Sequence, residues 1–524
     1  QCAAGRAGPD RRPAVTSTAL RLCTASSCRS RGSEAIRARL EEVAAASGGQ
    51  VRVTGVGCLG PCSDGPLLAM GQRLFSLEAP HPEPLARSLE QAVEQHRVDT
   101  WRPPGGPLIP ADDAFLRLQR RLVLERCGAI DPECLEAALA HGSYQQLQQL
   151  RMQSSPAAVI DAVRRSGLRG RGGAGYPTGL KWAAVAAMAG DNKLVVCNAD
   201  EGDPGAFMDR TVMEGDPHRL LEGMAIAAFA IGAQRGFIYV RADYPLAIAR
   251  LRRAIEAAQA RGWLGSAMAG TPFRFEVEIR VGAGAYVCGE ETALIRSIEG
   301  GRGVPRPRPP YPAERGAFGL PTLINNVETL ANVPVLLRLG PDAYRPGTKV
   351  FSLTGHVRRG GVLEVPMGTS LRTIVEEMGG GAPAGRSIKA VQTGGPSGGC
   401  VPASHLDTPV DYESLQALGS TMGSGGMVVL DDTTDMVDLA AFFMAFCRDE
   451  SCGTCVPCRC GTVQLEHLLR KLLAQQATRS DLEQLEGLCH TVQQASLCGL
   501  GQNAPNPVLS VLRHFRSELE QRLP

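Results

Sequence analysis

The chain has 524 residues, of which 44% are hydrophobic, and its formal net charge is only +2. One hydrophobic core does not extend over this length, so three or four domains are expected. The balanced charge excludes a typical nucleic-acid-binding protein, and no apolar run reaches the roughly 20 residues that span a bilayer. The chain has 17 cysteines and begins without an apolar signal core. We therefore expect a cytoplasmic protein whose cysteines serve metal sites rather than disulfides.

The first folded unit, residues 18–100, follows a tail at 1–17 that we expect to be disordered. Within this unit a helical pattern over 33–46 separates two strands, and each strand runs into a pair of cysteines. The pairs have the spacings C-x4-C and C-x3-C and consist of Cys23, Cys28, Cys58 and Cys62. Four thiolates hold zinc or a [2Fe–2S] cluster. The spacing favours the cluster, because paired zinc ligands usually stand two residues apart.

A glycine-rich loop at 170–182, GRGGAGYPTGLKW, is the most distinctive stretch of the second unit, residues 101–345. Glycine lets the backbone approach a ligand closely and turn its N–H groups toward an anion such as a phosphate. Lys181 adds a mobile positive charge, and Tyr176 adds a flat ring. The loop also matches G-x-G-x-x-G, but a helical pattern over 156–166 precedes it where a dinucleotide motif requires a strand.

Acidic residues follow a buried strand predicted at 193–197, in the segment NADEGDPGAFMDR at 198–210. Acids at the carboxyl end of a strand, beside a glycine-rich loop, are typical of a nucleotide-binding crevice. A loop of Asx turns would have a similar composition. The acids that could accept hydrogen bonds from a cofactor are Asp200, Glu201 and Asp203.

A second glycine loop follows a strand predicted at 273–281 and opens into a helix within 282–300. Glu290 and Glu291 stand at the start of this helix, where they would also suit the helix dipole without any ligand. The next segment, 302–333, is rich in proline, and we predict it to be a long connector.

Two smaller units complete the chain. Residues 346–430 have two strands around a Gly–Gly turn and a helix at 370–378, which predicts a β-grasp domain with a spacer or interaction role. Residues 431–524 are predicted to be helical. They contain a C-x2-C-x2-C run formed by Cys452, Cys455 and Cys458.

This cysteine run is typical of a [4Fe–4S] site and requires a fourth ligand. Cys460 is too close along the chain, and Cys489 lies inside a helical stretch. Cys498 lies in a glycine-flanked turn, SLCGLG, where a thiolate can point toward a cluster. We therefore predict Cys498 as the fourth ligand, with a zinc site as the alternative.

The three loops and the C-terminal cysteine motif occur in the order found in the flavin subunit of respiratory complex I, which the chain resembles over about 110–524. The N-terminal unit resembles the thioredoxin-like [2Fe–2S] domain of a neighbouring complex I subunit. The resemblance implies a multidomain α/β protein. Its parts are a thioredoxin-like [2Fe–2S] domain at 18–100, a Rossmann-like FMN- and NAD(H)-binding domain at 101–345, a β-grasp domain at 346–430 and a helical [4Fe–4S] domain at 431–524.

The resemblance also implies which residues bind the cofactors. Contacts to FMN or its phosphate are implied for Gly170, Arg171, Gly172, Gly173, Gly175 and Lys181. The same flavin pocket would be lined by Asn198, Asp200, Tyr286, Gly289, Glu290, Asn325 and Asn326. The dinucleotide would be faced by Glu201, Asp203, Glu291, Tyr176 and Tyr311, with the two tyrosines bracketing its adenine. The family often has a further aromatic residue near position 184, where this chain has alanine.

Fusion of the [2Fe–2S] domain to the flavin subunit resembles the beta subunit of soluble NAD-dependent formate dehydrogenase and the diaphorase subunit of NAD-reducing hydrogenase. The short N-terminal region favours the formate dehydrogenase form. NADP-reducing hydrogenase subunits carry extra ferredoxin-type cysteines at the C-terminus, which this sequence lacks. The implied partners are a molybdenum- and iron–sulfur-containing catalytic subunit and a small [2Fe–2S] subunit in a hetero-oligomer without nucleic acid or membrane.

The implied activity is hydride exchange between NAD(H) and FMN, and single-electron exchange between FMN and the clusters. FMN carries the hydride transfer, so no side chain is expected to act as a catalytic acid or base. The alternatives within the family are a hydrogenase diaphorase and a complex I-type NADH dehydrogenase subunit. Outside it, a thiol redox sensor predicts iron-free thiol oxidation, and a zinc-based interaction protein predicts a colourless preparation.

Overall fold

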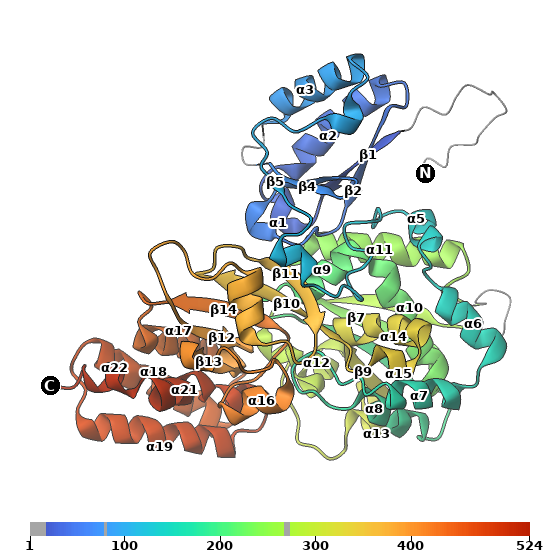
Figure 1. Ribbon diagram of the computed structural model, residues 1–524. Coiled ribbons are helices and arrows are strands. Elements are labelled where there is room, and N and C mark those ends of the chain that lie inside the picture. The colour runs from blue at the N-terminus through green and yellow to red at the C-terminus, as the bar shows by residue number, and fades with distance from the viewer. Residues whose placement is uncertain (1–16, 78–80, 267–272) are drawn as a thin grey trace.

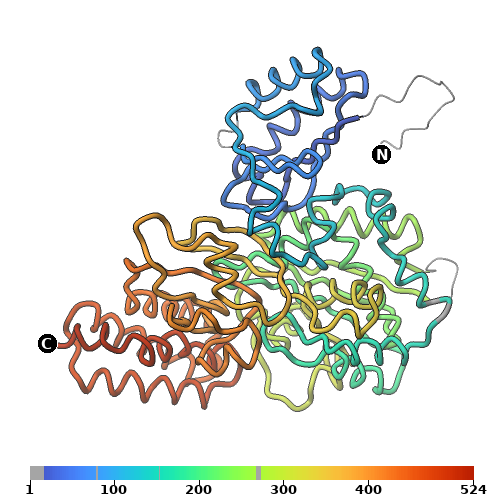
Figure 2. The backbone as a smooth tube through the Cα atoms, viewed as in Figure 1, coloured from blue at the N-terminus to red at the C-terminus, as the bar shows by residue number. Residues whose placement is uncertain are grey.

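Three β-sheets and a C-terminal group of helices organise the chain, as Figures 1 and 2 show for this computed structural model. The structure describes residues 17–77, 81–266 and 273–524. The predicted multidomain α/β architecture is confirmed. The predicted disordered tail lies outside the described residues, except for residue 17. Among the described helices, none is both long and apolar enough to cross a membrane.

The N-terminal unit, at the top of Figure 1, is a five-stranded mixed sheet in the order β2-β1-β3-β4-β5. β1 and β2 run parallel, with Thr18 paired with Val51, and the other neighbours are antiparallel. The amphipathic helices α2 and α3 contact each other and bury their apolar faces in one core with the sheet. The elements are β1 (Thr18–Cys23), α1 (Ser26–Arg29), α2 (Ser33–Ala46), β2 (Val51–Val56), β3 (Leu67–Met70), β4 (Arg73–Ser76), α3 (Pro82–Glu94) and β5 (Leu108–Ile109).

The central domain contains a four-stranded, fully parallel sheet in the order β8-β7-β6-β9. Parallel strands are normally buried on both faces and read as continuous apolar runs, as LVVC of β6 does. The strands are β6 (Leu194–Ala199), β7 (Arg235–Arg241), β8 (Glu276–Gly282) and β9 (Thr322–Asn326). The helices are α4 (Ala114–Arg117), α5 (Leu135–Ala140), α6 (Gln145–Gln153), α7 (Pro156–Arg165), α8 (Thr178–Ala186), α9 (Met208–Gly215), α10 (Pro217–Ile231), α11 (Pro245–Ala260), α12 (Glu291–Ile298), α13 (Pro312–Arg315), α14 (Val327–Leu339) and α15 (Pro341–Tyr344).

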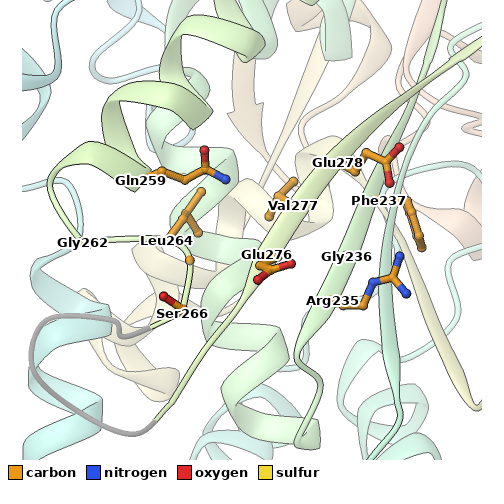
Figure 3. A pocket seen from close by; sticks show the side chains of 11 residues that line it. Arg235, Gly236, Phe237, Gln259, Gly262, Leu264, Ser266, Glu276, Val277 and Glu278 are labelled. Carbon is orange, nitrogen blue, oxygen red and sulfur yellow. The ribbon is translucent and has the colours of Figure 1, made fainter.

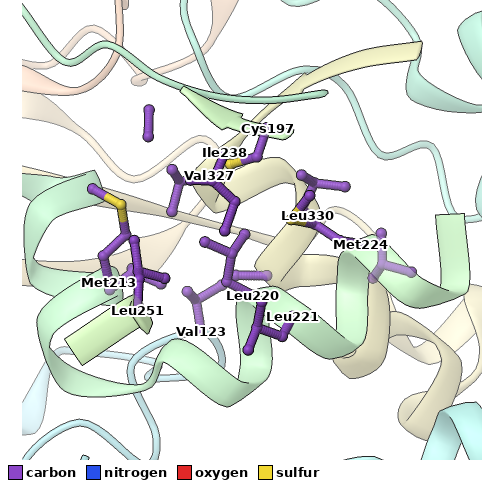
Figure 4. Close-up of a cluster of buried hydrophobic side chains, with 14 of the residues drawn as sticks. Val123, Cys197, Met213, Leu220, Leu221, Met224, Ile238, Leu251, Val327 and Leu330 are labelled. Carbon is purple, nitrogen blue, oxygen red and sulfur yellow. The ribbon is translucent and has the colours of Figure 1, made fainter. Parts of the chain in front are cut away.

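Helices cover both faces of this sheet. On one face α10, α14 and α11 pack against alternate strand residues, and Figure 4 shows Leu220 and Leu330 beside Cys197 and Ile238. On the other face α12 packs against the intervening strand residues, together with the C-terminal cysteine region. The sheet therefore lies between the main core and the helices that carry the cysteine motif.

The prediction that residues 302–333 form a long connector is wrong for the second half of this segment. Proline dominates only up to Pro312, and the chain then forms α13, β9 and α14. β9 pairs in parallel with the central strand β6, so it completes the sheet. Asn326 caps α14 by accepting a hydrogen bond from the Thr329 amide. The short apolar run TLI followed by a capping asparagine was the local signal for this strand and helix.

The third sheet, orange in Figure 1, has the order β11-β10-β14-β12-β13 and mixes parallel and antiparallel pairs. It agrees with the predicted β-grasp domain, including the predicted helical segment, which forms a π-helix at Thr373–Met378. The other elements are β10 (Thr348–Gly355), β11 (Gly361–Pro366), β12 (Ile388–Thr393), β13 (Gly399–Pro402), α16 (Tyr412–Ala417) and β14 (Gly426–Asp431).

The C-terminal residues form the predicted helical domain, red in Figure 1. α17 packs on α18, α18 packs on α19, and α21 packs on β13 of the third sheet. The helices are α17 (Met436–Asp449), α18 (Val456–Leu473), α19 (Arg479–Ala495), α20 (Gly499–Asn503), α21 (Asn506–His514) and α22 (Arg516–Glu520).

Candidate functional site

A cavity of about 470 Å³ opens at the carboxyl ends of the central strands. Asn198 and Asn326 are cross-strand neighbours at the ends of β6 and β9, and both line it. The turn Tyr286–Gly289 after β8 forms a second wall. Carboxyl ends of parallel strands are where α/β sheets bind ligands, so the topology places this cavity where a nucleotide is expected.

Ten of the eighteen predicted cofactor residues line this cavity. They are Gly172, Gly173, Asn198, Asp200, Glu201, Asp203, Tyr286, Gly289, Glu290 and Asn326. The other eight do not belong to its lining and are Gly170, Arg171, Gly175, Tyr176, Lys181, Glu291, Tyr311 and Asn325. Tyr311 lines a neighbouring hollow with Arg308 and Cys498, and Tyr176 is more than half exposed. Arg171 and Asn325 are buried behind the lining, with 2% and 6% exposed. The predicted set therefore includes residues outside the cavity lining, some buried and some exposed.

A tyrosine from the third sheet's domain, Tyr412, lines the cavity and holds the glycine loop. Tyr412 donates from its hydroxyl to the Gly170 carbonyl at 2.7 Å, and the Arg169 guanidinium lies over its ring at 4.1 Å. A Cβ on Gly175 would come within 2.6 Å of that ring, and φ there is +62°. A Cβ on Gly172 would come within 2.9 Å of the Asn326 Cβ. Glycine is therefore required at positions 172 and 175.

Asp200 is the unpartnered polar group of the cavity. In the described residues neither of its carboxylate oxygens has a hydrogen-bond partner, although the side chain is buried. Burial raises the pKa of Asp200 to about 7, against the pull of Arg241, whose Nη1 lies 3.8 Å from Oδ1. A buried acceptor without a donor is costly. Ligand hydroxyl or amide groups would satisfy this one, so the cavity fits the polar chain and ring of a flavin nucleotide.

Lys181 lies next to this cavity in an ionic group rather than as a free charge. Its Nζ is 2.9 Å from Glu291 Oε2, and Arg308 Nη1 is 2.8 Å from Glu291 Oε1. Burial alone would raise the pKa of Glu291, but the two cations hold it below its usual value. The group ties α8 to the start of α12 and has more positive than negative charge, which suits a phosphate.

Three residues that were predicted to contact a cofactor have side chains that form hydrogen bonds within the protein. Glu201 accepts hydrogen bonds from the amides of Asp209 and Arg210 and so caps α9. Glu290 caps α12 through the amides of Thr292 and Ala293, which is the dipole role considered from the sequence.

The Asn325 Oδ1 accepts from the Trp182 indole N–H at 2.9 Å. The side chains of Glu201, Glu290 and Asn325 therefore hold the walls in place, whatever else they contact.

The third sheet's domain supplies a wall that sequence reasoning missed. Asp203 accepts from Tyr286 Oη at 2.9 Å and from Ser424 Oγ at 2.8 Å, and Tyr286 Oη also lies 3.0 Å from Ser397 Oγ. These bonds join the central domain to the loops GGPSGG and TMGSGG. The glycine content of both loops was the available signal. The domain predicted to have a spacer or interaction role therefore forms part of the cavity wall.

A second hollow lies at the opposite, amino end of the strands (Figure 3). It has about 440 Å³ and is lined by Arg235 and Glu276 at the strand starts and by Gln259 at the end of α11. None of the predicted cofactor residues lines it. Ligands of parallel sheets bind at the carboxyl ends, so we assign the nucleotide to the first cavity.

The four N-terminal cysteines converge as predicted. Cys58 Sγ and Cys62 Sγ are 3.4 Å apart, and the Cys23 thiol contacts both Cys28 and Cys58. Hydrogen bonds from Cys23 and Cys62, together with the Gly60 amide, hold the pKa of Cys58 well below its usual value. The same hydrogen bonds, together with burial, raise the pKa of Cys23 and of Cys62 well above the usual value. Four cysteines in mutual contact are the ligand set of a [2Fe–2S] cluster, so the group fits such a cluster by its chemistry.

The predicted C-terminal ligands also come together. Cys452, Cys455, Cys458 and Cys498 line one small cavity between α18, α20 and the central domain. Cys498 is the N-cap residue of α20. Burial raises the pKa of its thiol, and hydrogen bonds from the backbone N–H groups of Gly501 and Leu500 offset only part of that rise. Cys489 is buried inside α19 and does not line that cavity, as predicted.

Across the described residues, no three Cys, His, Asp or Glu side chains are placed to share a single metal ion. A cubane cluster spreads its ligands over four iron atoms, which suits thiols around a void.

Comparison with known proteins agrees with this arrangement. The Nuo51 FMN-binding domain matches residues 163–335, the SLBB domain matches 350–401, and the NADH-ubiquinone oxidoreductase-F iron-sulfur binding region matches 438–522. The F 2 subunit of NADH-quinone oxidoreductase of Rhizobium meliloti is 46% identical over 405 residues, covering 76% of this chain and 96% of that protein.

The chain belongs to the family of complex I flavin subunits. Within this family, NADP-reducing hydrogenase subunit HndC of Solidesulfovibrio fructosivorans is 51% identical over 409 residues, covering 77% of this chain and 83% of that protein. The crystal structure of NAD+-reducing [NiFe]-hydrogenase in the H2-reduced state contains a chain with a TM-score of 0.68 and 32% identity. That likeness covers 97% of this chain and 84% of the solved chain. The chain is thus an oxidoreductase flavin subunit of the NADH dehydrogenase and hydrogenase type, with FMN and a [4Fe–4S] region.

Proposed function

We propose that the chain exchanges a hydride between NAD(H) and FMN in the cavity at the carboxyl ends of β6, β8 and β9, and exchanges single electrons with a [4Fe–4S] cluster held by Cys452, Cys455, Cys458 and Cys498. The observation that carries this proposal is the adjacency of the two sites, which share the wall formed by Val287 and Leu500. FMN supplies the chemistry, because it accepts two electrons as a hydride and releases them one at a time.

The protein's own part is to bind and orient. The glycine loop brings backbone N–H groups to the nucleotide, and Asp200 accepts hydrogen bonds from it. Lys181 and Arg308 attract the phosphates, while Glu291 fixes both cations. The exposed rings of Tyr176 and Tyr311 bracket the adenine of NAD(H) as it arrives from solvent. No side chain acts as an acid or base in the hydride step.

We also propose a [2Fe–2S] cluster at the N-terminal thiols, Cys23, Cys28, Cys58 and Cys62. Their mutual contacts support one shared site, since Cys58 Sγ lies 3.4 Å from Cys62 Sγ and the Cys23 thiol contacts Cys28 and Cys58. The cluster exchanges electrons with the flavin side of the molecule, because both of its ligand loops contact the central domain.

We propose that the electron donor is a formate-oxidising subunit that contains molybdenum and iron–sulfur clusters. This subunit and a small [2Fe–2S] subunit would form a cytoplasmic hetero-oligomer with the chain. A hydrogenase partner is the second candidate. It is favoured by the HndC relative at 51% identity and by the NAD+-reducing [NiFe]-hydrogenase chain that covers 97% of this one.

Co-purification of the native complex, followed by NAD+ reduction with formate or with hydrogen, tests the donor. Formate-driven NADH formation supports the first partner, and hydrogen-driven formation supports the second. NADH-to-dye activity of the isolated chain tests the shared part of both proposals. A chain that bound no FMN and reduced no dye would contradict it.

A further inference from the structure

Two apolar side chains separate the flavin cavity from the cysteine cavity. Val287 and Leu500 are the residues common to the linings of both cavities. Each side chain is almost wholly buried, with 5% and 7% of its surface exposed. Both belong to one apolar cluster that includes Cys458 and Cys498 and the sheet residue Tyr239. In the described part of the chain, the side chains that the two linings share are therefore both apolar.

The backbone fixes both residues in this wall. The Tyr286 amide, directly before Val287, donates to Glu450 Oε2 at 2.8 Å, which ties this turn to the end of α17. Leu500 lies in the first turn of α20, next to the N-cap Cys498, and its amide is directed at that thiol. The Tyr286 ring also packs edge-to-face on Phe446 of α17 at 5.2 Å. Val287 and Leu500 therefore come from different domains and meet at a junction that is held on both sides.

We propose that Val287 and Leu500 form a dry partition that electrons cross between the flavin and the C-terminal cluster, and that this partition sets the cluster's reduction potential by keeping water from its flavin-facing side. This inference rests on the proposed function. In each crossing one electron leaves the flavin and one enters the cluster, and no atom is transferred. The two residues are positioning residues, since neither takes part in the hydride step.

The chemical reason lies in the charge of the cluster. Reduction adds one negative charge, and an apolar shell stabilises that charge less than water or a hydroxyl group does. A dry wall therefore holds the potential down, which favours return of the electron to the flavin. A polar or hydrated wall would raise the potential and retain the electron on the cluster.

The test compares Val287→Thr and Leu500→Ala with the wild-type chain. The first variant replaces a methyl by a hydroxyl at nearly constant volume, and the second opens a void that water can fill. We expect both to raise the cluster's midpoint potential in a redox titration followed by electron paramagnetic resonance. In D2O the reduced cluster should gain a coupling to exchangeable deuterium. Iron and FMN content should be unchanged.

Val463→Thr and Leu485→Ala are the matched controls. Val463 is exposed on α18, and Leu485 is buried in α19 away from the cluster cavity. Neither should move the potential. A cluster with unchanged potential and no new deuterium coupling in Val287→Thr would overturn the inference, whether or not Leu500→Ala folds. Wild-type protein that assembles neither FMN nor a [4Fe–4S] cluster would instead overturn the proposed function itself, and the iron and flavin analysis separates the two failures.

Discussion

At the N-terminal cysteine site the thiols touch one another, and the loops that carry them are bonded to other domains. At the C-terminal site the thiols surround a void, and most of their local hydrogen bonds come from the helical domain itself. The first pair of N-terminal ligands shows the contrast. Glu214 of α9 accepts from the Ser26 amide at 2.9 Å and from the Ser26 hydroxyl. Arg250 of α11 donates to Thr24 Oγ1 at 2.8 Å.

The second N-terminal loop is held just as closely. A Cβ on Gly57 would come within 2.5 Å of the Gly215 Cα, so the loop and α9 meet backbone to backbone. The Val362 amide of β11 donates to the Gly60 carbonyl at 3.0 Å. The N-terminal ligand geometry therefore depends on contacts with both the central and the third-sheet domain.

At the C-terminal site the local contacts are internal. Ser451 Oγ lies 3.3 Å from Cys458 Sγ, and the Leu497 amide reaches Cys455 Sγ at 3.5 Å. The bond to this loop from the central domain, from Arg302 to the Cys452 carbonyl, is exposed to solvent. The N-terminal cysteine site therefore depends on how the domains dock. The C-terminal cysteine site depends on its own loop and on the wall formed by Val287 and Leu500.

The largest expected effect is that of Cys498→Ala. It should abolish the [4Fe–4S] signal, because a cubane cluster needs four ligands. The N-terminal signal and NADH-dependent flavin reduction should remain, because those sites lie in other domains. Electron paramagnetic resonance and iron analysis measure the outcome. Cys489→Ala is the control and should keep the cluster; loss of the cluster in that variant alone would show that the fourth ligand is Cys489.

Glu214→Ala should selectively lower occupancy of the N-terminal cluster. Two donors of the half-buried Ser26 lose their acceptor, and each lost hydrogen bond costs about 1 kcal/mol. The [4Fe–4S] signal should be unaffected. Arg302→Ala is the matched change at the C-terminal site and should have little effect, because an exposed contact contributes little. Equal loss of both clusters in Glu214→Ala would contradict the claim that only the N-terminal site depends on contacts with other domains.

Lys181→Ala should lower flavin occupancy or NADH-to-dye activity while leaving the iron content intact. Loss of a charge-assisted contact weakens binding by on the order of tenfold or more. Lys389→Ala is the control, because it also removes a Lys–Glu pair, with Glu518 at 2.7 Å, far along the chain from the glycine loop. Normal FMN content together with normal dye activity would refute a role for Lys181.

The last prediction concerns the pH dependence of stability and leaves the loaded protein untouched. Burial raises the pKa of Asp200 from 3.8 to about 7 in the folded chain without a ligand. The folded state therefore disfavours the ionised form, and wild-type stability should fall relative to Asp200→Asn as pH rises from about 4 to 7, then level off. One pKa unit corresponds to about 1.4 kcal/mol, so the difference reaches about 4 kcal/mol at most. Thermal unfolding of the FMN-free proteins at pH 5 and pH 8 measures it, and a difference independent of pH would contradict a raised pKa.

What could be predicted from the sequence was local. The cysteine spacings, the glycine-flanked turn around Cys498 and the helix before the glycine loop are features of a few neighbouring residues, and the structure agrees with each. Contacts such as Ser26 to Glu214 and Tyr412 to Gly170 join residues 188 and 242 positions apart and leave no periodic signal. β9 was missed because proline-rich sequence precedes a strand of only five residues.

The central claim is that NADH electrons reach the C-terminal cluster through the flavin cavity of this one chain. Anaerobic titration of the isolated chain with NADH, followed by visible and electron paramagnetic resonance spectra, tests it most directly. We predict that flavin absorbance bleaches, that the reduced [4Fe–4S] signal grows in, and that Cys498→Ala keeps the bleaching but loses this signal. A flavin that bleaches while an intact [4Fe–4S] cluster, reducible by dithionite, stays oxidised under excess NADH would contradict the account.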